Sequence, residues 1–262
     1  MKLAVDGREA FIYTGGRAFD PALPCIVFVH GAENDHSVWA LQSRYFAHHG
    51  HGVLVPDLPG HGRSPGPALA SIEAIADWVG ALLVAAGVNR AVVVGHSMGA
   101  LIALETAHRH PAIVERIALL GPAVPMKVSD ELLAATANDE PRARRMINVW
   151  CHAATAHYPG NPGPGSWVIG GNARLLARQP IGTLHIDFKA CNDYTGGAAA
   201  AASIGCPVLL LVASRDVMTP ARGAKAFAAT FANARVTEIA GSGHNLMGEK
   251  PDEVLDALLA MF

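Results

Sequence analysis

The residues best suited to chemistry begin with Gly95-His96-Ser97-Met98-Gly99, which follows an apolar run and precedes a helical pattern. A serine at a sharp turn between a buried strand and a helix presents its hydroxyl as a nucleophile. The turn is so tight that only glycine fits two residues before and two residues after the serine, so Gly95 and Gly99 are steric requirements. The first amides of the following helix point toward whatever the hydroxyl attacks. The motif therefore predicts nucleophilic catalysis by Ser97.

Two residues much later in the chain, Asp216 and His244, are suited to activate this serine. A serine hydroxyl is a poor nucleophile at neutral pH, so it needs a base that takes its proton and an acid that orients the base. Asp216 and His244 each lie just beyond a predicted strand, in the order Ser, Asp, His. Singly, Asp216 could cap a helix and His244 could be a surface histidine, but their joint placement favours catalysis. We predict that Ser97 is the nucleophile, His244 the base and Asp216 the orienting acid.

The reaction also needs backbone donors for a developing oxyanion. We expect one donor to be the amide of Met98, the first amide of the helix after the serine. The other is expected in the loop after the strand that ends near Gly31, at Ala32. His30 and His96 stand at strand ends beneath the site, so we predict that they are structural hydrogen-bonding groups and not bases.

Alternating strands and helices position these residues. Apolar runs, as expected of strands covered on both faces, occur at 25–29, 52–55, 91–94, 116–120 and 207–213, and residues 235–240 are predicted to form the last strand. Helical spacing occurs at 38–49, 71–86, 100–108, 220–231 and 251–262. The alternation predicts a parallel sheet with helices on both faces. Strand-like runs at 3–5 and 9–13 predict an antiparallel start to that sheet.

The regular alternation fails between Pro122 and Gly205, where helical patches at 130–137, 142–157 and 172–178 and a loop at 158–165 replace the strands. We therefore divide the chain into an α/β core, residues 1–121 and 206–262, and a helical lid, residues 122–205. The lid is expected to cover Ser97 and to form most of the substrate pocket. Its candidate apolar walls are Met126, Leu132, Leu133, Met146, Val149, Trp150, Trp167 and Phe188. The candidate substrate-binding residues are His36, Trp150, Trp167, Asn192, Asp193 and Tyr194.

Composition narrows the classes of function. The 262 residues carry 20 Lys and Arg and 22 Asp and Glu, a formal net charge of −2, with no basic stripe, so nucleic acid is not an expected partner. No apolar stretch approaches the ~18 residues that span a bilayer. The first ten residues lack the apolar core of a signal peptide. We therefore expect a cytoplasmic protein that does not bind membranes.

The metal-ligating residue types do not form a recognisable site. Four widely separated cysteines, Cys25, Cys151, Cys191 and Cys206, show no Cys-x-x-Cys spacing and are expected to be reduced structural thiols. The histidine groups at 48–51 and 108–110 lack the spacing of metal ligands. We expect no metal, no cofactor and a small-molecule substrate as the partner. The sequence leaves the oligomeric state open, a homodimer included.

Together these motifs resemble those of the α/β-hydrolase family. The matching residues are His30-Gly31 with Trp39 downstream, Asp57-Leu58-Pro59-Gly60-His61-Gly62-Arg63-Ser64, Gly95-His96-Ser97-Met98-Gly99, Asp216 and Gly243-His244. The resemblance covers the core and implies the α/β-hydrolase fold, a mostly parallel eight-stranded sheet with helices on both faces and an inserted helical lid. It further implies a cofactor-free serine hydrolase, similar to esterases and lactonases, that cleaves a small carboxylic ester, lactone or thioester through an acyl-enzyme.

The same fold also carries other chemistry. Haloalkane dehalogenases and epoxide hydrolases place an aspartate at the turn, so Ser97 argues against both. Carbon–carbon bond hydrolases resemble Gly-Asn-Ser-Met-Gly-Gly there, whereas this chain has His96 and Ala100 in place of the asparagine and the last glycine. That activity stays an alternative, as does a cofactor-free perhydrolase or haloperoxidase, which keeps a serine triad. A ligand-binding receptor without catalysis is the alternative of a different class.

Overall fold

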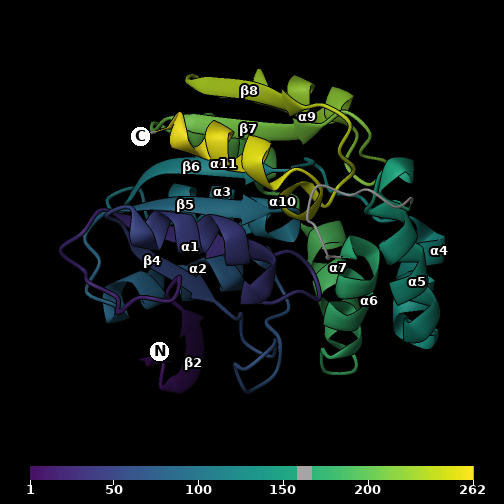
Figure 1. Cartoon of the computed structure of the whole chain (residues 1–262), viewed down its shortest axis with the longest axis horizontal. Helices are drawn as coiled ribbons and strands as arrows, with labels where there is room; N and C mark the ends of the chain where they lie inside the picture. Colours follow the sequence, from purple (N-terminus) through teal and green to yellow (C-terminus); the bar gives the residue numbers. More distant parts are fainter. Residues whose placement is uncertain (158–166, 262) are drawn as a thin grey trace.

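The computed structural model describes residues 1–157 and 167–261, and eight strands in these ranges form one sheet (Figure 1). The strand order is β1-β2-β4-β3-β5-β6-β7-β8. The strands from β3 onward are parallel, whereas β1 and β2 pair in antiparallel fashion, so the predicted mostly parallel sheet is confirmed. The strands are β1 (Lys2–Val5), β2 (Arg8–Tyr13), β3 (Cys25–Val29), β4 (Gly52–Pro56), β5 (Ala91–His96), β6 (Val114–Leu120), β7 (Val208–Ala213) and β8 (Ala234–Ile239).

Helices cover both faces of the sheet because apolar side chains of the central strands point to both sides. In β3, Ile26 and Phe28 pack on one face against Trp39, whereas Val27 and Val29 pack on the other face. The first face is covered by η1 (His36–Trp39), α1 (Ala40–His48), α10 (Leu246–Glu249) and α11 (Pro251–Leu259). The second face is covered by α2 (Ile72–Ala85), α3 (Met98–Arg109), α8 (Gly197–Ser203) and α9 (Ala221–Ala228). This is the layering expected of a sheet buried on both sides.

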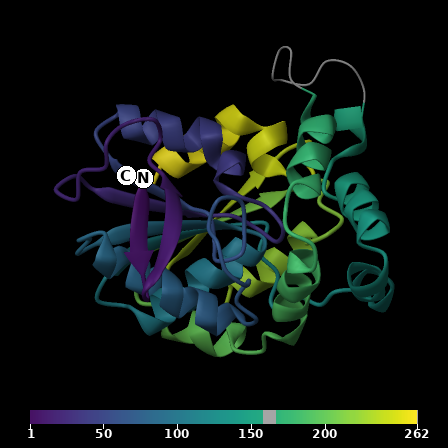
Figure 2. The same ribbon diagram turned by 90° about the horizontal axis from the view of Figure 1, so that it is seen from below.

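Between β6 and β7 the described residues form helices and no strand. They are α4 (Asp130–Asn138), α5 (Glu140–Trp150), η2 (Ala154–His157), α6 (Val168–Ala177), α7 (Thr183–Asp193) and α8. The helices α4 to α7, here called the cap helices, gather beside the end of the sheet to which the parallel strands point (Figures 1 and 2). They enclose a small apolar core of their own around Leu132, Ile147, Leu184 and Phe188.

The cap differs in detail from the sequence-based prediction. The helix predicted over 142–157 ends at Trp150, and a short 3-10 helix follows it. Asp139 begins α5 by accepting a hydrogen bond from the amide of Arg142, which the sequence pattern did not indicate. The helices α7 and α8 were not predicted, since α8 is almost all alanine and has no apolar periodicity. The predicted loop at 158–165 and the last residue of the closing helix, Phe262, lie outside the described residues.

No helix in the ranges 1–157 and 167–261 has the length and apolar character needed to cross a membrane.

Candidate active site

Ser97 lies at the turn between β5 and α3, in a strained backbone conformation. Its φ is 56° and its ψ is −118°, which costs roughly 1–3 kcal/mol for a residue other than glycine. The neighbouring backbone leaves no room for side chains at the two glycines of the motif. A Cβ on Gly95 would lie 2.8 Å from the amide nitrogen of Ala100, and one on Gly99 would lie 2.7 Å from the carbonyl oxygen of His30. The packing of β3, β5 and α3 therefore requires both glycines.

Asp216 and His244, which follow β7 and β8, are hydrogen-bonded to each other. Nδ1 of His244 donates to Oδ2 of Asp216 at 2.7 Å. The hydroxyl of Thr219 donates to the same oxygen, and the amides of Met218 and Thr219 donate to Oδ1, all three at 2.8 Å. Burial acts to raise the pKa of Asp216, but the bonds and charge of His244 and Thr219 outweigh it, and the pKa lies below its ordinary value. The carboxylate is therefore ionised and holds a proton on Nδ1 of His244.

Since Nδ1 of His244 is the donor, its Nε2 is left as an acceptor. This atom is buried without a hydrogen-bond partner among the described residues. It belongs to a residue that lines the same cavity as Ser97. The main chain of His244 is fixed as well, because its carbonyl oxygen accepts from Nε2 of His96 at 2.8 Å. The arrangement leaves Nε2 of the imidazole free to take up a proton.

His30 and His96 lie beneath this site as structural groups. Burial lowers the pKa of His30 to about 4 and that of His96 to about 3, so both rings are neutral. His30 donates from Nδ1 to the carbonyl of Gly31 at 2.8 Å and accepts at Nε2 from the amide of Leu58 at 3.1 Å. The ring of His30 thus connects the end of β3 to the loop after β4.

Two cavities meet at Ser97. The larger one, here called the large cavity, has a volume of about 410 Å³, and the smaller one, here called the small chamber, has about 50 Å³. Both are lined by Ala32, Ser97, Phe188, Met218 and His244. Ala32, one of the two expected oxyanion donors, thus stands in the wall of both cavities. The other expected donor, Met98, is the first residue of α3 and directly follows Ser97.

The cap supplies much of the apolar wall of the large cavity. Met126, Leu132, Trp150 and Phe188 line it, as the sequence analysis expected. The other four residues expected there, Leu133, Met146, Val149 and Trp167, do not. Leu133 and Met146 pack against the core of the cap, whereas Val149 and Trp167 are 56% and 71% exposed. The wall also contains residues that the sequence analysis did not name, among them Val128, Cys191, Val217 and Met218.

Four candidate substrate-binding residues line neither cavity and are bonded elsewhere. The main-chain amide and Nδ1 of His36 both donate to Asp57. The hydroxyl of Tyr194 donates to Oε2 of Glu105 at 2.6 Å, within the main core. The other two bond to nearby segments, Asn192 to the amide of Val128 and Asp193 to the side chain of Lys189. Polarity and proximity in sequence were insufficient to place these four side chains in the pocket.

The loop that carries Ala32 is tied to the cap through buried hydrogen bonds. Oε1 of Glu33 accepts from Nη2 and Nε of Arg144, at 2.5 and 2.8 Å. The amide of Glu33 donates to Oδ2 of Asp187 at 2.8 Å, and this oxygen also lies 2.8 Å from Nε2 of His61. Burial raises the pKa of Glu33 to about 8, although Arg144 acts to lower it. The position of the Ala32 amide therefore depends on contacts with α5 and α7.

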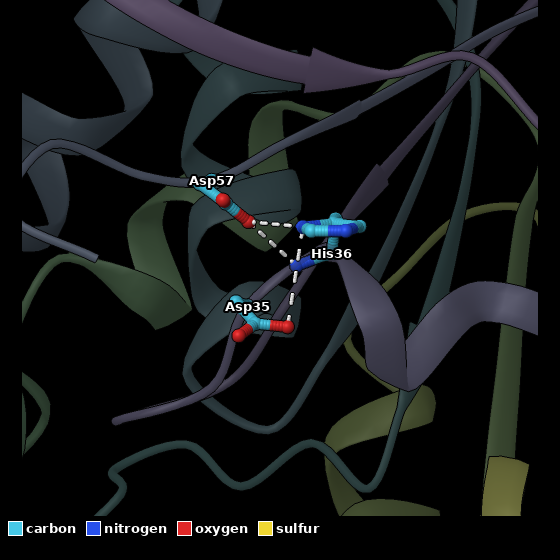
Figure 3. Close-up of side chains that lie close together, drawn as sticks. All are labelled: Asp35, His36 and Asp57. Atoms are coloured by element: carbon cyan, nitrogen blue, oxygen red, sulfur yellow. Dashed lines mark hydrogen bonds and ion pairs between the residues drawn. The ribbon is translucent and has the colours of Figure 1, made fainter. Parts of the chain in front are cut away.

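One group of side chains in the described part of the chain has the composition of a metal site. Ligand atoms of Asp35, His36 and Asp57 all lie within 4.8 Å of one another (Figure 3). Their oxygens are already used: Oδ1 of Asp57 accepts from the amide and Nδ1 of His36, at 2.8 and 2.7 Å. Oδ2 of Asp35 accepts from Arg178 at 2.5 Å. A cation here would compete with a guanidinium, so we interpret the group as a brace of the loop.

Two positioning residues were not named by the sequence analysis. Thr219 follows Asp216 by three residues, a spacing typical of side chains that bond to a nearby backbone or cap a helix, and could have been found from it. Glu249 offers no such signal, because its partners lie far away in the sequence or belong to a loop. Its Oε1 accepts from the amide of Gly243 and its Oε2 from that of Ala153, both at 3.0 Å. Glu249 thus fastens the loop of His244 to the segment that follows α5.

Comparison with known proteins gives one family and many related structures. The sequence model described as "Alpha/beta hydrolase family" matches residues 26–257. Lipase LipV of Mycobacterium tuberculosis is 33% identical over 144 residues, which are 50% of this chain and 54% of LipV. The matches to curated relatives such as Protein ABHD8 and LipV cover from 22% to 54% of those proteins' length.

Two solved structures show the same fold over the whole chain. The enol-lactonase from Burkholderia xenovorans LB400 superposes with a TM-score of 0.87 at 22% identity, covering 99% of this chain and 98% of the other. Est816, described as an N-acyl homoserine lactone degrading enzyme, superposes with a TM-score of 0.84 at 25% identity, covering 100% of both chains. The fold of this chain is therefore a known architecture.

Proposed function

The chain belongs to the alpha/beta hydrolase family, and from this premise we propose that it is a cofactor-free serine hydrolase of small carboxylic esters, lactones or thioesters. One observation carries the proposal. Ser97, at its strained turn, shares two cavity walls with His244, whose Nε2 is unpartnered among the described residues and whose Nδ1 is held by Asp216.

The proposed reaction proceeds in two half-reactions. In the first, Oγ of Ser97 bonds to the substrate carbonyl carbon while its proton passes to Nε2 of His244. The bond to the leaving group then breaks, and the leaving group takes this proton. In the second, water bonds to the acyl carbon, its proton passes through the same nitrogen, and Ser97 is released with the proton. The amides of Ala32 and Met98 stabilise the oxyanion of both tetrahedral intermediates.

The environment of Ser97 and two of the relatives support an ester or lactone as the substrate. The wall of the large cavity is mostly apolar, which suits an apolar acyl group. LipV is named a lipase, and Est816 is described as degrading N-acyl homoserine lactones. A lipase acts on esters and a lactone is a cyclic ester, so both names fit the substrate class of the proposal.

Hydrolysis of p-nitrophenyl butyrate tests the proposal. Ser97→Ala and His244→Ala should each lower kcat by several orders of magnitude, because the three residues act as a unit. Ser203→Ala, an exposed serine in α8, is the matched control and should keep wild-type activity. Near-normal turnover by folded Ser97→Ala would refute the mechanism. A wild-type protein that turns over no ester or lactone would favour the receptor alternative.

A further inference from the structure

A second hollow lies against the wall of the large cavity. It is here called the outer hollow, has a volume of about 700 Å³ and is lined by residues within the ranges 149–154 and 214–217 together with His157. Among the described residues, Trp150 and Val217 alone line both the large cavity and the outer hollow. A side chain that touches two spaces lies between them, so these two residues form part of the wall that separates the spaces.

The two residues of this wall come from different parts of the fold. In the loop after β7, Asp216 lines the outer hollow and Met218 lines the large cavity, so Val217 lies where the chain passes from one side of the wall to the other. Trp150 is the last residue of α5, and its neighbour Val149 lines the outer hollow but not the large cavity. The wall is therefore built from the end of a cap helix and a loop of the core.

The wall is one side chain thick at these two positions, because each side chain has open space on both of its sides. Val217 is 66% exposed, whereas Trp150 is half-buried and packs against the core of the cap. Both side chains are apolar, and so is that of Val149 on the outer side. Shortening either side chain of the wall would therefore open the large cavity onto a space that also suits an alkyl chain.

The volume of the large cavity limits the ester that fits inside this wall. An engineered protein cavity of about 150 Å³ binds benzene, a ring of six carbons, so a cavity of about 410 Å³ holds roughly sixteen carbons on the same scale. The butyrate ester of p-nitrophenol has ten carbons and fits, whereas the dodecanoate ester has eighteen and does not. An acid chain that is too long for the cavity meets a packed wall, where overpacking is unfavourable.

We propose that Trp150 and Val217 are specificity-determining residues, which close the large cavity on the side of the outer hollow and thereby set the upper limit to the length of the acid. This inference rests on the proposed function, which places the acyl group in the large cavity. It narrows that function to esters of short and medium acids, of up to about eight carbons when the leaving group is p-nitrophenol. A longer acid reaches the outer hollow only when the wall is opened.

Two tryptophans of the cap provide a matched test. Trp150 lines both spaces, and Trp167 lines neither the large cavity nor the outer hollow. The measured quantity is kcat/KM for p-nitrophenyl dodecanoate divided by kcat/KM for p-nitrophenyl butyrate, with each ester below the concentration at which it forms micelles. We expect a ratio of at most about 0.1 for the wild type, a ratio at least about tenfold higher for Trp150→Ala, and a change within about twofold for Trp167→Ala.

Two valines repeat the test with a smaller change, which keeps the inference testable if Trp150→Ala does not fold. Val217 lines both spaces and Val149 only the outer hollow, so Val217→Ala should raise the ratio several-fold and Val149→Ala should leave it within about twofold.

Three results would overturn the inference while the proposed function stands: a wild-type ratio near one, a ratio that neither Trp150→Ala nor Val217→Ala raises, or an equal rise in the two control variants. If the wild type cleaves neither ester faster than Ser97→Ala does, the proposed function fails and the inference fails with it.

Discussion

Replacing Asp216 by asparagine should disable the site through the tautomer of His244, without removing any heavy atom. The two oxygens of Asp216 have different surroundings. Oδ1 accepts from the amides of Met218 and Thr219, and neither of these donors can reverse its role. Oδ2 faces Nδ1 of His244 and the hydroxyl of Thr219, which can both become acceptors. In Asp216→Asn the NH₂ group therefore takes the place of Oδ2 and donates to Nδ1, so the proton of the imidazole moves to Nε2.

The size of the effect follows from these bonds. An imidazole protonated on Nε2 cannot accept the proton of Ser97. The active tautomer returns only if the side-chain amide of the asparagine rotates by about 180°. Its NH₂ group then faces the backbone amides of Met218 and Thr219, and both of their hydrogen bonds are lost. At about 1–3 kcal/mol for each buried group left unsatisfied, the cost is roughly 2–6 kcal/mol. Since 1.36 kcal/mol corresponds to a factor of ten in rate, kcat should fall by roughly 30-fold to 10⁴-fold.

The assay is the kcat of p-nitrophenyl butyrate hydrolysis by folded protein, with folding checked by circular dichroism and thermal unfolding. Asp252→Asn is the matched control, since Asp252 is an exposed aspartate in the first turn of α11 and should keep its activity. If folded Asp216→Asn keeps more than about a third of the wild-type kcat, the tautomer argument is wrong and Asp216 is not the residue that orients His244.

The remaining predictions concern the supports of the site. Glu249→Gln replaces one of two acceptor oxygens by an NH₂ group that faces a backbone amide. The free energy of unfolding should therefore fall by about 1–3 kcal/mol, and Tm by about 2–4 °C for each kcal/mol. Glu253→Gln, at an exposed position of the next helix, is the control and should leave Tm unchanged. Burial raises the pKa of Glu249 from 4.5 to about 7, so the folded state binds the carboxyl proton more tightly than the unfolded state does. The protonated carboxyl therefore adds its full contribution to the free energy of unfolding below pH 4.5, and this contribution is lost as the pH rises through 7. Urea unfolding should therefore show the stability gap between wild type and Glu249→Gln narrowing from pH 4.5 to 7, and a gap independent of pH would contradict the shift. Gly99→Ala should abolish activity or folding, because its Cβ would collide with the backbone of β3. Gly171→Ala is the matched control, since a Cβ on this helical glycine would meet nothing within 4 Å. It should raise the free energy of unfolding by up to about 1 kcal/mol, measured by thermal unfolding.

The sequence predicted the core far better than the cap, and the difference has a physical cause. Most strands of the core are short apolar runs bordered by a glycine or a proline, so the local sequence indicates both that they exist and where they end. The turn at Ser97 is similarly local, because two glycines and one serine within five residues satisfy its steric demands. The placement of Asp216 and His244 after two successive strands follows from the alternation of strand and helix, since the carboxyl ends of parallel strands meet at one edge of the sheet.

The contacts of the cap could not be predicted from the sequence, because they connect residues that are distant in the chain. Glu33 meets Arg144 across 111 residues, and Ala153 meets Glu249 across 96. The hydrophobic periodicity of a sequence does not indicate such long-range pairs. The sequence therefore predicted that the pocket wall is apolar, but not which residues form it. Trp150 and Trp167 show the limit, since both are tryptophans of the cap, yet one lines the large cavity and the other is 71% exposed. The same long contacts fasten the loops of Ala32 and His244 to the cap. A change in the cap should therefore alter both the pocket that selects the substrate and the loops that position the oxyanion donor and the base.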